Sequence, residues 1–290
     1  MPQINGSTEL FGIIGNPVRH SLSPAMHNAA FASLGMNRVY VPMPVNDVAQ
    51  AMSGLRSLGF RGASVTVPHK EAVIPFLDEL DPVADKIGAV NTLLLRQDSE
   101  GRTIVRGFNT DWLGANAALA AAQVELRGKR VVVAGAGGAA KAVGFGLIEA
   151  GAEVVITNRT AESGQELAQW LNSEFIALDD LPWLTADVFI NTTSVGMEPN
   201  TEGIIIPPHL LSKFSAVMDI VYAPLETRLL NKAKTAGCRT VDGLAMLLHQ
   251  GAEQFRIWTG VPAPEQVMRA ALEEGLLRRT ICAVCGSFLR

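Results

Sequence analysis

Apolar residues occur along the chain in short runs, and amphipathic segments with helical spacing separate them. Residues 9–15, ELFGIIG, form an apolar run closed by Gly-Asn-Pro, which predicts a strand that ends in a turn. In residues 23–35 the apolar side chains fall on one helical face. Ser23 is a favoured N-cap, Pro24 suits the first helical position, and a glycine ends the segment. The start of the chain thus predicts a strand followed by a helix.

The same alternation continues along the chain. Apolar runs predict strands at residues 38–43, 63–67, 89–96, 102–109, 187–197, 216–222 and 238–243. Helical patterns occupy residues 45–59, 69–80, 110–123, 224–237 and most of the chain after Gly243, with Pro262 and Pro264 as a break. Strands that alternate with helices favour parallel sheets covered by helices on both faces, which is the α/β class.

One region has a different residue pattern from the rest of the chain, and this pattern indicates a second domain. In residues 127–160, three valines run directly into a cluster of glycines, and a helix and another buried strand follow. We therefore place a domain boundary inside or just after the helix at 110–123. The predicted domains are residues 1–115, completed by the C-terminal helices at 243–290, and residues 116–242.

Composition is compatible with two folded domains and narrows the class of partner. The chain has 290 residues, of which 48% are hydrophobic and 18% charged, so it can bury a sizeable core. Its net charge of −4 gives no reason to expect a nucleic-acid partner. No apolar run reaches the roughly 18 residues that span a bilayer, and the start of the chain lacks the pattern of a secretory signal. We expect no membrane partner and a cytoplasmic location.

The three cysteines offer little chemistry. Cys282 and Cys285 form an isolated C-x-x-C near the end of the chain. A zinc site needs more Cys or His ligands than this pair, and a redox motif normally follows a βαβ strand. Cys238 precedes a predicted short strand, where a thiol is expected to pack. We expect no metal site and two incidental thiols in the tail.

The glycine cluster predicts a nucleotide site. Residues 135–140, GAGGAA, fit G-x-G-x-x-G/A between a strand and a helix. Gly135 permits a tight turn, Gly137 lets backbone approach a pyrophosphate, and Ala140 allows close packing of helix on strand. The free N–H groups and dipole of the helix suit phosphates. Because the flanking strand, helix and second strand are present, the pattern favours a Rossmann-type dinucleotide-binding domain over a plain glycine-rich turn.

The strand after the glycine cluster indicates which dinucleotide is bound. NAD-preferring sites place Asp or Glu at the end of this strand, for the ribose 2′-hydroxyl. Here Asn158, Arg159 and Thr160 occupy that end. The guanidinium of Arg159 can pair with a 2′-phosphate, which favours NADP. An arginine exposed in a turn, and the use of both cofactors, are the alternatives.

Polar residues at predicted element ends in the first half are candidates for binding a substrate. Ser21 and Ser23 lie at a helix start, where hydroxyls can grip a carboxylate, although Ser23 could equally cap the helix. Thr66 ends a strand and could be an ordinary β-branched strand residue. Asn91 lies early in an apolar strand, where an amide is unusual, although a turn or edge position would explain it. Asp111 begins a helix, where the dipole alone favours an acid.

A lysine stands just beyond the end of the predicted strand at 63–67. The strand exits through Pro68, His69 and Lys70. Ligands bind at strand ends in α/β proteins, so Lys70 is either part of a reaction centre or a solvated charge.

Eight segments of the chain resemble the shikimate dehydrogenases. They are SLSPAMHNAAF, SVTVPHK, GAVNT, GFNTDWLG, GAGGAA, NRT, TSVGM and DGLAMLLHQGAEQF, in that family's order and reaching to about residue 260. The resemblance implies an NADP-dependent oxidoreductase acting on a CH–OH group, which reversibly reduces 3-dehydroshikimate to shikimate in chorismate and aromatic amino acid biosynthesis. It also implies two α/β domains with a cleft between them: an N-terminal substrate domain with a mainly parallel sheet, and a Rossmann-type NADP domain.

The resemblance implies roles for individual residues, transferred motif by motif. Lys70 and Asp111 would be the catalytic pair. Substrate would be bound by Ser21, Ser23, Thr66, Lys70, Asn91, Asp111, Tyr222 and Gln250, the two serines holding its carboxylate. NADP would be bound by Gly135, Ala136, Gly137, Gly138, Ala139, Asn158, Arg159, Thr160, Ile220, Gly243 and Met246. Of these, Ile220, Gly243 and Met246 would lie near the nicotinamide. The family often has a basic residue three positions after the threonine of NRT, and here that residue is Ser163.

The implied reaction gives Lys70 a task. The nicotinamide supplies the hydride, so the protein must orient the substrate and manage one proton. An ammonium within hydrogen-bond reach of the ketone oxygen would stabilise the developing negative charge and donate the proton. Asp111 could orient that ammonium. Burial would lower the pKa of Lys70 and a nearby carboxylate would raise it, and the sequence leaves both open.

Three other functions fit parts of the sequence. A quinate/shikimate dehydrogenase using NAD and NADP would need a Ser21/Ser23 pocket that tolerates an extra hydroxyl. A non-catalytic NADP-binding sensor would not need the lysine and the aspartate. A lysine-dependent dehydrogenase of a pteridine-type substrate would not explain the Ser-x-Ser pair. We expect a small-molecule substrate, no nucleic-acid partner, and a monomer or homodimer.

Overall fold

The computed structural model describes residues 4–287, with side-chain surroundings up to residue 278, and the chain forms two compact units. The first unit comprises the residues up to Thr110 and those from Gly251 onward, and the second comprises Asp111–Gln250. The side chains of Cys282 and Cys285 lie outside the described residues. Within the described range, no helix is both long and apolar enough to cross a bilayer.

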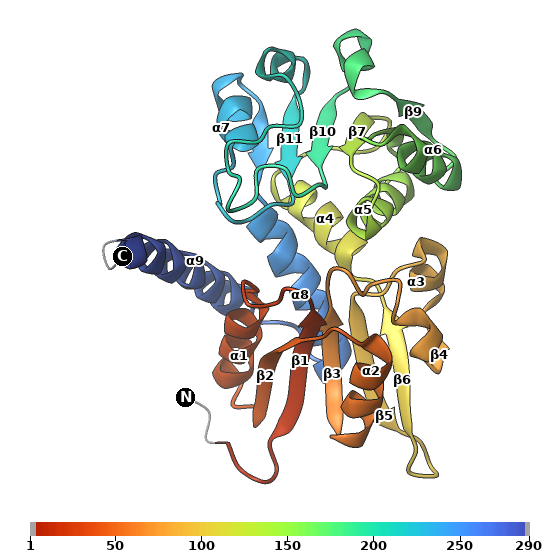
Figure 1. Cartoon of the computed structure of the whole chain (residues 1–290), viewed down its shortest axis with the longest axis vertical. Coiled ribbons are helices and arrows are strands. Elements are labelled where there is room, and N and C mark those ends of the chain that lie inside the picture. Colours follow the sequence, from red (N-terminus) through yellow and green to blue (C-terminus); the bar gives the residue numbers. More distant parts are fainter. Residues whose placement is uncertain (1–3, 288–290) are drawn as a thin grey trace. The chain divides into compact units, whose positions relative to one another are not determined.

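A mixed six-stranded sheet lies at the centre of the first unit (Figure 1). Its order is β2-β1-β3-β5-β6-β4. The bounds are β1 (Glu9–Gly15), β2 (Arg38–Pro44), β3 (Phe60–Val65), β4 (Glu79–Leu80), β5 (Thr92–Gln97) and β6 (Thr103–Phe108). Strand β1 is parallel to β2 and β3, and β4 is parallel to β6, whereas β5 is antiparallel to both neighbours. The carboxyl end of β3 and the amino end of β5 therefore meet at one edge, with Ser64 opposite Thr92.

Helices cover both faces of this sheet. They are α1 (Ser23–Ser33), α2 (Val48–Ser57), α3 (Pro82–Ile87) and the end of α8 (Gly243–Thr259), whereas α9 (Glu265–Ser287) packs on α1. On one face, Met52 of α2 and Ala84 of α3 pack against strand residues that include Ile14. On the other face, Phe11 of β1 contacts aromatic rings of α1 and α8. Alternate residues of β1 thus enter two cores, as the period of a strand requires.

Two predictions for the first unit are wrong. Residues 69–80 are not a helix: turns lead to a 3₁₀ helix (Ile74–Phe76) and then to β4. Pro75 lacks the N–H that a longer helix would need, and the chain beyond it bonds to β6 through Asp78 N–H and Val105 O, 3.0 Å apart. Ser23 is not the N-cap of α1, because Leu22 occupies that position and no side chain caps the helix.

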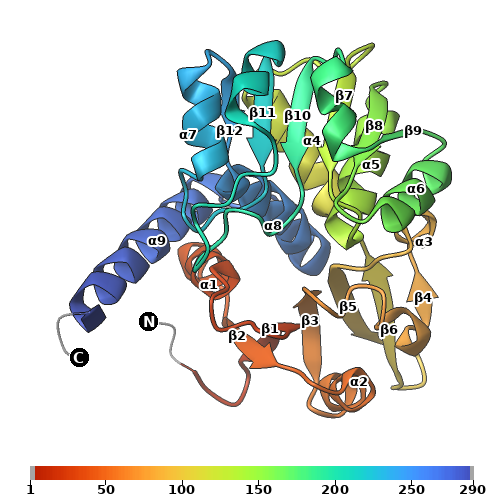
Figure 2. The same ribbon diagram turned by 45° about the horizontal axis from the view of Figure 1, so that its top comes forward.

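The second unit contains a fully parallel sheet (Figure 2). Its order is β12-β11-β10-β7-β8-β9. The bounds are β7 (Arg130–Ala134), β8 (Glu153–Thr157), β9 (Glu174–Ile176), β10 (Val188–Asn191), β11 (Ala216–Asp219) and β12 (Arg239–Val241). The chain adds strands outward from β7 on one side and then crosses to the other, which is the doubly wound Rossmann order. The predicted α/β class with a Rossmann-type unit is confirmed.

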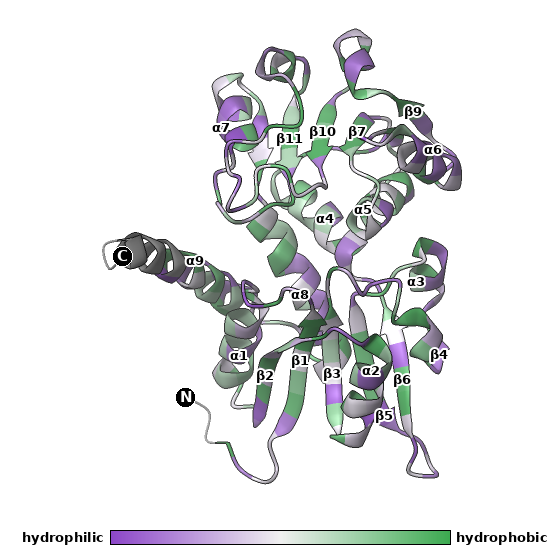
Figure 3. Ribbon diagram, viewed as in Figure 1, coloured by the Kyte–Doolittle hydropathy of each residue, from purple (hydrophilic) through white to green (hydrophobic). Residues whose placement is uncertain are grey.

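Both faces of the second sheet are buried. Val131 and Val133 of β7 pack with α4 (Asp111–Ala121), α5 (Gly138–Glu149) and α6 (Ala161–Trp170), whereas Val132 and Ala134 pack with α7 (Arg228–Thr235) and the 3₁₀ helices Leu178–Trp183 and Pro208–Lys213. Figure 3 shows the central strands β10 and β11 as hydrophobic. Burial on both faces explains why these strands read as unbroken apolar runs.

Candidate active site

One edge of the first sheet brings together three of the predicted substrate residues, Thr66, Lys70 and Asn91. Thr66 directly follows β3, and its N–H donates to Ile14 O at 2.9 Å. The N–H of Val65 donates to Asn91 O at 2.8 Å, and the N–H of Val90 donates to Lys70 O at 2.8 Å. The main chain carrying Lys70 is therefore bonded to the segment carrying Asn91.

The turn before Lys70 is also fixed from its other side. His69 is buried, and its Nε2–H donates to Val45 O at 2.8 Å. Its backbone N–H donates to Thr66 O at 2.9 Å. These bonds hold the backbone of the half-buried Lys70 without using its ammonium. His69 therefore has a structural role in this turn.

Asn91 has a fixed amide orientation. It directly precedes β5 and is 2% exposed. Its Oδ1 accepts from Thr110 N–H at 2.8 Å and from Thr92 Oγ1 at 2.7 Å, and its Nδ2 donates to Thr110 Oγ1 at 2.9 Å. Because a backbone N–H can only donate, the carbonyl oxygen of the amide must face Thr110 N. Asp111 is the next residue of the chain.

The two predicted carboxylate-binding serines lie at the start of α1, after the carboxyl end of β1. Ser21 Oγ accepts from Ser23 N–H at 3.2 Å. Ser23 is 4% exposed, and its hydroxyl contacts Tyr40 rather than capping the helix. The alternative in which Ser23 only caps α1 is therefore wrong.

Two further predicted substrate residues, Asp111 and Gln250, lie in the second unit. A Cβ atom at Gly114 of α4 would stand 2.7 Å from Cβ of Gln250 and 2.8 Å from its N, so this glycine lets α4 and α8 approach closely. Asp111 precedes Gly114 by three residues and lies on the same helix face. Both Asp111 and Gln250 are buried, and Gln250 Nε2 donates to Leu247 O at 2.9 Å.

The glycine loop between β7 and α5 has room for phosphate groups. Gly135 has φ +124, and a Cβ there would stand 2.4 Å from Thr192 Oγ1, so glycine is required. Gly137 is the N-cap of α5, makes no side-chain cap bond, and has nothing within 4 Å of its Cβ position. The first N–H groups of α5 are thus accessible to an anion. This cradle fits a dinucleotide pyrophosphate.

The end of β8 presents an available cation. Within the described part of the chain, Arg159 is exposed and has no ion-pair partner. The turn beside it is ordered by Asn158, whose Nδ2 donates to Thr160 O and to Ser163 Oγ, each at 2.9 Å. Ser163 therefore stabilises the turn and adds no second positive charge. The arrangement is suited to one phosphate group at Arg159.

Three residues predicted near the nicotinamide have structural contacts of their own. A Cβ at Gly243 would stand 2.3 Å from Ile220 O, so α8 can begin beside the end of β11 only with glycine there. Met246 is buried in the core cluster of the second unit, and Ile220 packs against that cluster. Tyr222 is half-buried in the segment after β11. Their roles toward a cofactor or substrate stay predictions.

Comparison with known proteins identifies the family of the chain. Models of a shikimate dehydrogenase substrate-binding domain, a shikimate/quinate 5-dehydrogenase domain and a shikimate 5′-dehydrogenase C-terminal domain match residues 13–93, 118–200 and 243–273. The shikimate dehydrogenase (NADP(+)) of Moorella thermoacetica is 47% identical over 95% of this chain and 96% of its own length. That of Methanosarcina acetivorans is 48% identical over 92% and 98%.

The chain belongs to the shikimate dehydrogenase family.

A solved structure agrees with this assignment. The Thermus thermophilus shikimate 5-dehydrogenase, determined in complex with NADP(H) and shikimate, is 39% identical and superposes with a TM-score of 0.84 over 93% of this chain and all of that one. The family models match segments of both units, which agrees with the resemblance drawn from the sequence.

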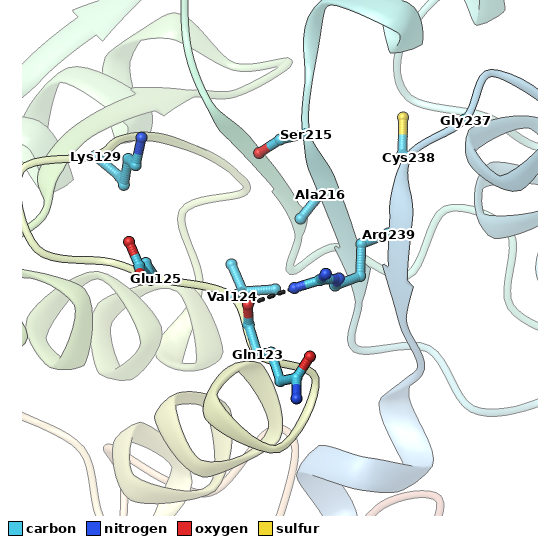
Figure 4. A pocket seen from close by; sticks show the side chains of 9 residues that line it. All are labelled: Gln123, Val124, Glu125, Lys129, Ser215, Ala216, Gly237, Cys238 and Arg239. Carbon is cyan, nitrogen blue, oxygen red and sulfur yellow. Dashed lines mark hydrogen bonds between the residues drawn. The ribbon is translucent and has the colours of Figure 1, made fainter.

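A separate hollow lies in the second unit (Figure 4). It is at the amino ends of the strands, whereas the glycine loop follows the carboxyl end of β7. It has a volume of about 560 Å³ and is lined by residues at the amino ends of strands, including Lys129, Ser215 and Arg239. Arg239 donates to Gln123 O, and Lys129 lies 3.3 Å from Asp187. Both cations are therefore engaged by neighbouring groups, and none of the predicted cofactor residues lines this hollow. Among the described residues, no group of three or more His, Cys, Asp or Glu could hold a metal ion.

One buried carboxylate beside the predicted nicotinamide residues was missed by sequence reasoning. Asp219, the last residue of β11, accepts from Val221 N–H at 3.0 Å, Asn191 Nδ2 at 2.9 Å and Thr227 Oγ1 at 2.7 Å. It thereby joins the segments after β10 and β11. Burial raises its pKa to about 6, and the three hydrogen bonds oppose this rise. An aspartate at the end of a Rossmann strand followed by a threonine eight residues later was the available signal.

Asp219 is expected to make stability depend on pH. Its pKa is about 6 in the folded protein and about 3.9 when unfolded, so the folded state binds more protons between these values. Its contribution is therefore largest below about pH 4 and falls by about 3 kcal/mol as the pH rises through 6. We expect Asp219→Asn, measured by urea unfolding, to gain stability relative to the wild type by about that amount between pH 4 and pH 7.

The matched control for Asp219 is Asp187→Asn. The backbone hydrogen bond from Arg130 lowers the pKa of Asp187, so its removal should produce a pH dependence of opposite sign. An Asp219→Asn difference from wild type that is the same at pH 4 and pH 7 would show that the carboxyl of Asp219 does not titrate in this range.

Proposed function

We propose that the chain interconverts 3-dehydroshikimate and shikimate with NADP, as a step in aromatic amino acid biosynthesis. The observation that carries this proposal is the bonded sheet edge that holds Thr66, Lys70 and Asn91 together. It occurs in a chain 47% identical to a relative named shikimate dehydrogenase (NADP(+)). Lys70 and Asp111 are the proposed catalytic pair. A monomeric or homodimeric state and a cytoplasmic location belong to the same proposal.

The substrate carboxylate is proposed to bind Ser21 and Ser23. Ser23 is the first residue of α1 and Ser21 lies two residues before it, at the helix end where the dipole favours an anion. Ring hydroxyls bind Thr66, Asn91, Asp111 and Gln250. Thr66 and the two amides can donate and accept, whereas a carboxylate at Asp111 only accepts. Tyr222 adds a contact.

NADP is proposed to bind the second unit. The glycine loop, Gly135 to Ala139, and the start of α5 receive the pyrophosphate. Asn158 and Thr160 border the adenosine ribose, and Arg159 pairs with its 2′-phosphate. Ile220, Gly243 and Met246 border the nicotinamide, which when bound supplies the hydride that a ring ketone accepts.

The chain's own residues manage the proton. Lys70 holds a proton on Nζ and donates it to the oxygen on which negative charge develops during reduction. In the reverse direction, neutral lysine removes the proton of the substrate hydroxyl. Asp111 is the proposed partner that orients the lysine head.

A matrix of rates tests this function. Steady-state kcat/KM is measured for shikimate and quinate, each with NADP and NAD. We expect shikimate with NADP to be the best pair. Quinate is expected to be about 10- to 100-fold worse, because its extra hydroxyl would be buried beside Ser21 and Ser23 without a designed partner, at about 1–3 kcal/mol.

Other outcomes of the matrix identify the rivals. Comparable rates for quinate and shikimate would indicate a dual-substrate enzyme. Binding of NADPH without turnover of either acid would replace the proposal with a sensor or with a dehydrogenase of another substrate.

A further inference from the structure

A chain of buried hydrogen bonds crosses the first unit beneath the proposed substrate residues. We name it the Gln254 network, and its members are Tyr40, Ser64, Gln254, Thr92 and Asn91. Each is at most 5% exposed. Tyr40 and Ser64 oxygens are 2.7 Å apart, and Ser64 Oγ donates to Gln254 Oε1 at 2.8 Å. Gln254 Nε2 donates to Asn91 O at 3.1 Å and to Thr92 Oγ1 at 3.0 Å.

The amide of Gln254 fixes the direction of every bond on the Tyr40 side. The carbonyl oxygen of Asn91 can only accept, so the atom of Gln254 that faces it must be the NH₂ group. The other atom, Oε1, can only accept, so Ser64 must donate to it. Ser64 has a single hydroxyl hydrogen, so Tyr40 must donate to Ser64. The Tyr40 oxygen then has only its lone pairs left for other donors.

The same amide fixes the direction on the Asn91 side. Gln254 donates to Thr92 Oγ1, and Thr92 donates its own hydrogen to Asn91 Oδ1 at 2.7 Å. This bond and the one from Thr110 N–H keep the Asn91 carbonyl turned into the network. One side chain on α8 therefore sets the direction of the bonds from Tyr40 to Thr92, and together with Thr110 N–H it holds the Asn91 amide.

We propose that Gln254 is a positioning residue, which holds the main chain and the amide of Asn91 in place for the substrate. The inference rests on the proposed function, in which Asn91 binds a ring hydroxyl, and Gln254 reaches Asn91 through its main-chain oxygen and through Thr92. Gln254 acts only through these neighbours. A side chain with an acceptor on one side and two donors on the other is needed here, and glutamine supplies it.

The testing variant is Gln254→Glu, which keeps the shape of the side chain and changes its donors. Protonated, the introduced carboxyl can donate to Asn91 O. Ionised, it presents an acceptor to that carbonyl and repels it, and Thr92 is drawn away from Asn91 Oδ1. We expect KM for shikimate to rise about tenfold more than in the wild type as the pH is raised from 6 to 9, with KM for NADP unchanged.

The surrounding groups do not titrate in this window. The titratable side chains that face Gln254 are His27 of α1 and Tyr40 of β2. Burial lowers the pKa of His27 to about 3, with Gln254 opposing the shift, and burial raises the pKa of Tyr40 far above its usual value. Both stay neutral from pH 6 to 9 in the wild type. A new pH dependence in the variant therefore originates in the introduced carboxyl, either directly or through the rise that an ionised carboxylate causes in the pKa of the adjacent His27.

A purely structural role for Gln254 predicts a different result. Partial unfolding lowers the concentration of active enzyme, and so the apparent kcat, without changing KM. Trp258→Phe is the matched control on the same helix, because it removes a buried bond to Leu93 O of 2.9 Å outside the network. It is expected to lower Tm and to leave both KM values unchanged at every pH.

The outcomes separate the inference from the function on which it rests. A wild-type chain that does not oxidise shikimate overturns both. A wild-type chain that does, with a Gln254→Glu variant whose KM for shikimate follows that of the wild type at every pH, overturns the inference alone. If that variant does not fold, Ser64→Ala removes the donor to Gln254 Oε1. It should raise KM for shikimate and not for NADP, and an unchanged KM for shikimate overturns the inference.

Discussion

Lys70→Ala is expected to lower kcat for shikimate oxidation by about 10²–10⁴-fold, the usual contribution of a positioned acid or base. The affinity for NADP should stay nearly the same, because the residues proposed to hold the cofactor lie in the second unit. The backbone at Lys70 is held by Val90 N–H and by the bonds of His69, none of which uses the lysine side chain. The loss should therefore reflect chemistry and not folding. Steady-state kinetics and fluorescence titration of NADPH measure the two quantities.

Two further variants test whether the effect of Lys70→Ala comes from loss of proton transfer at this position. Lys86→Ala removes an exposed lysine from α3 of the same unit and should leave kcat unchanged. Lys70→Arg keeps the positive charge but does not release a proton at working pH, so it should keep substrate binding better than turnover. A Lys70→Ala enzyme that retains turnover within a few-fold of the wild type would remove this residue from the mechanism.

The architecture could be predicted because each sheet has a clear pattern in the sequence. The strands of the second unit are apolar on both faces, and they therefore stand out as short valine- and isoleucine-rich runs. The glycine loop could be recognised because each residue has one local requirement, such as the positive φ of Gly135. Thr66 and Lys70 were found because they follow a strand, and Asn91 because an amide is unusual in an apolar run.

Other features could not be predicted because distant contacts decide them. The segment at 69–80 has a helical composition, yet its backbone bonds to β6, far along the chain. Ser23 has the sequence of a cap, yet its hydroxyl contacts Tyr40 of a neighbouring strand. Local preferences are weak compared with such tertiary bonds.

The polar interior of the first unit was also invisible in the sequence. Ser64 and Thr92 read as ordinary strand residues, and Gln254 as one of several polar residues on a helix. Their bonds span up to 190 positions, and only the fold brings them together. Gly243 is a different case. A Cβ at this position would clash with Ile220 O, so the fold itself requires glycine here, independently of any cofactor.

Arg159→Ala is expected to raise KM for NADP by about 10- to 100-fold and to leave KM for NAD nearly unchanged. A charge-assisted hydrogen bond contributes about 1.5–3 kcal/mol, and the guanidinium is the one proposed partner of the 2′-phosphate, since Ser163 supplies no second charge. Because Arg159 is exposed and has no ion-pair partner in the described part of the chain, its removal breaks no internal interaction. The measurement is KM and kcat for both cofactors with saturating shikimate.

The salt dependence of the Arg159 effect separates its charge from its shape. An exposed cation that pairs with a phosphate loses strength as salt screens it, so raising ionic strength should increase KM for NADP in the wild type and much less in Arg159→Ala. Arg127→Ala, an exposed arginine before β7 at the opposite edge of the same sheet, should change neither cofactor's KM. Equal effects of Arg159→Ala on NADP and NAD would mean that this arginine acts on a part common to both cofactors. The preference would then have to come from the N–H groups at the start of α6, whose N-cap Thr160 makes no side-chain bond.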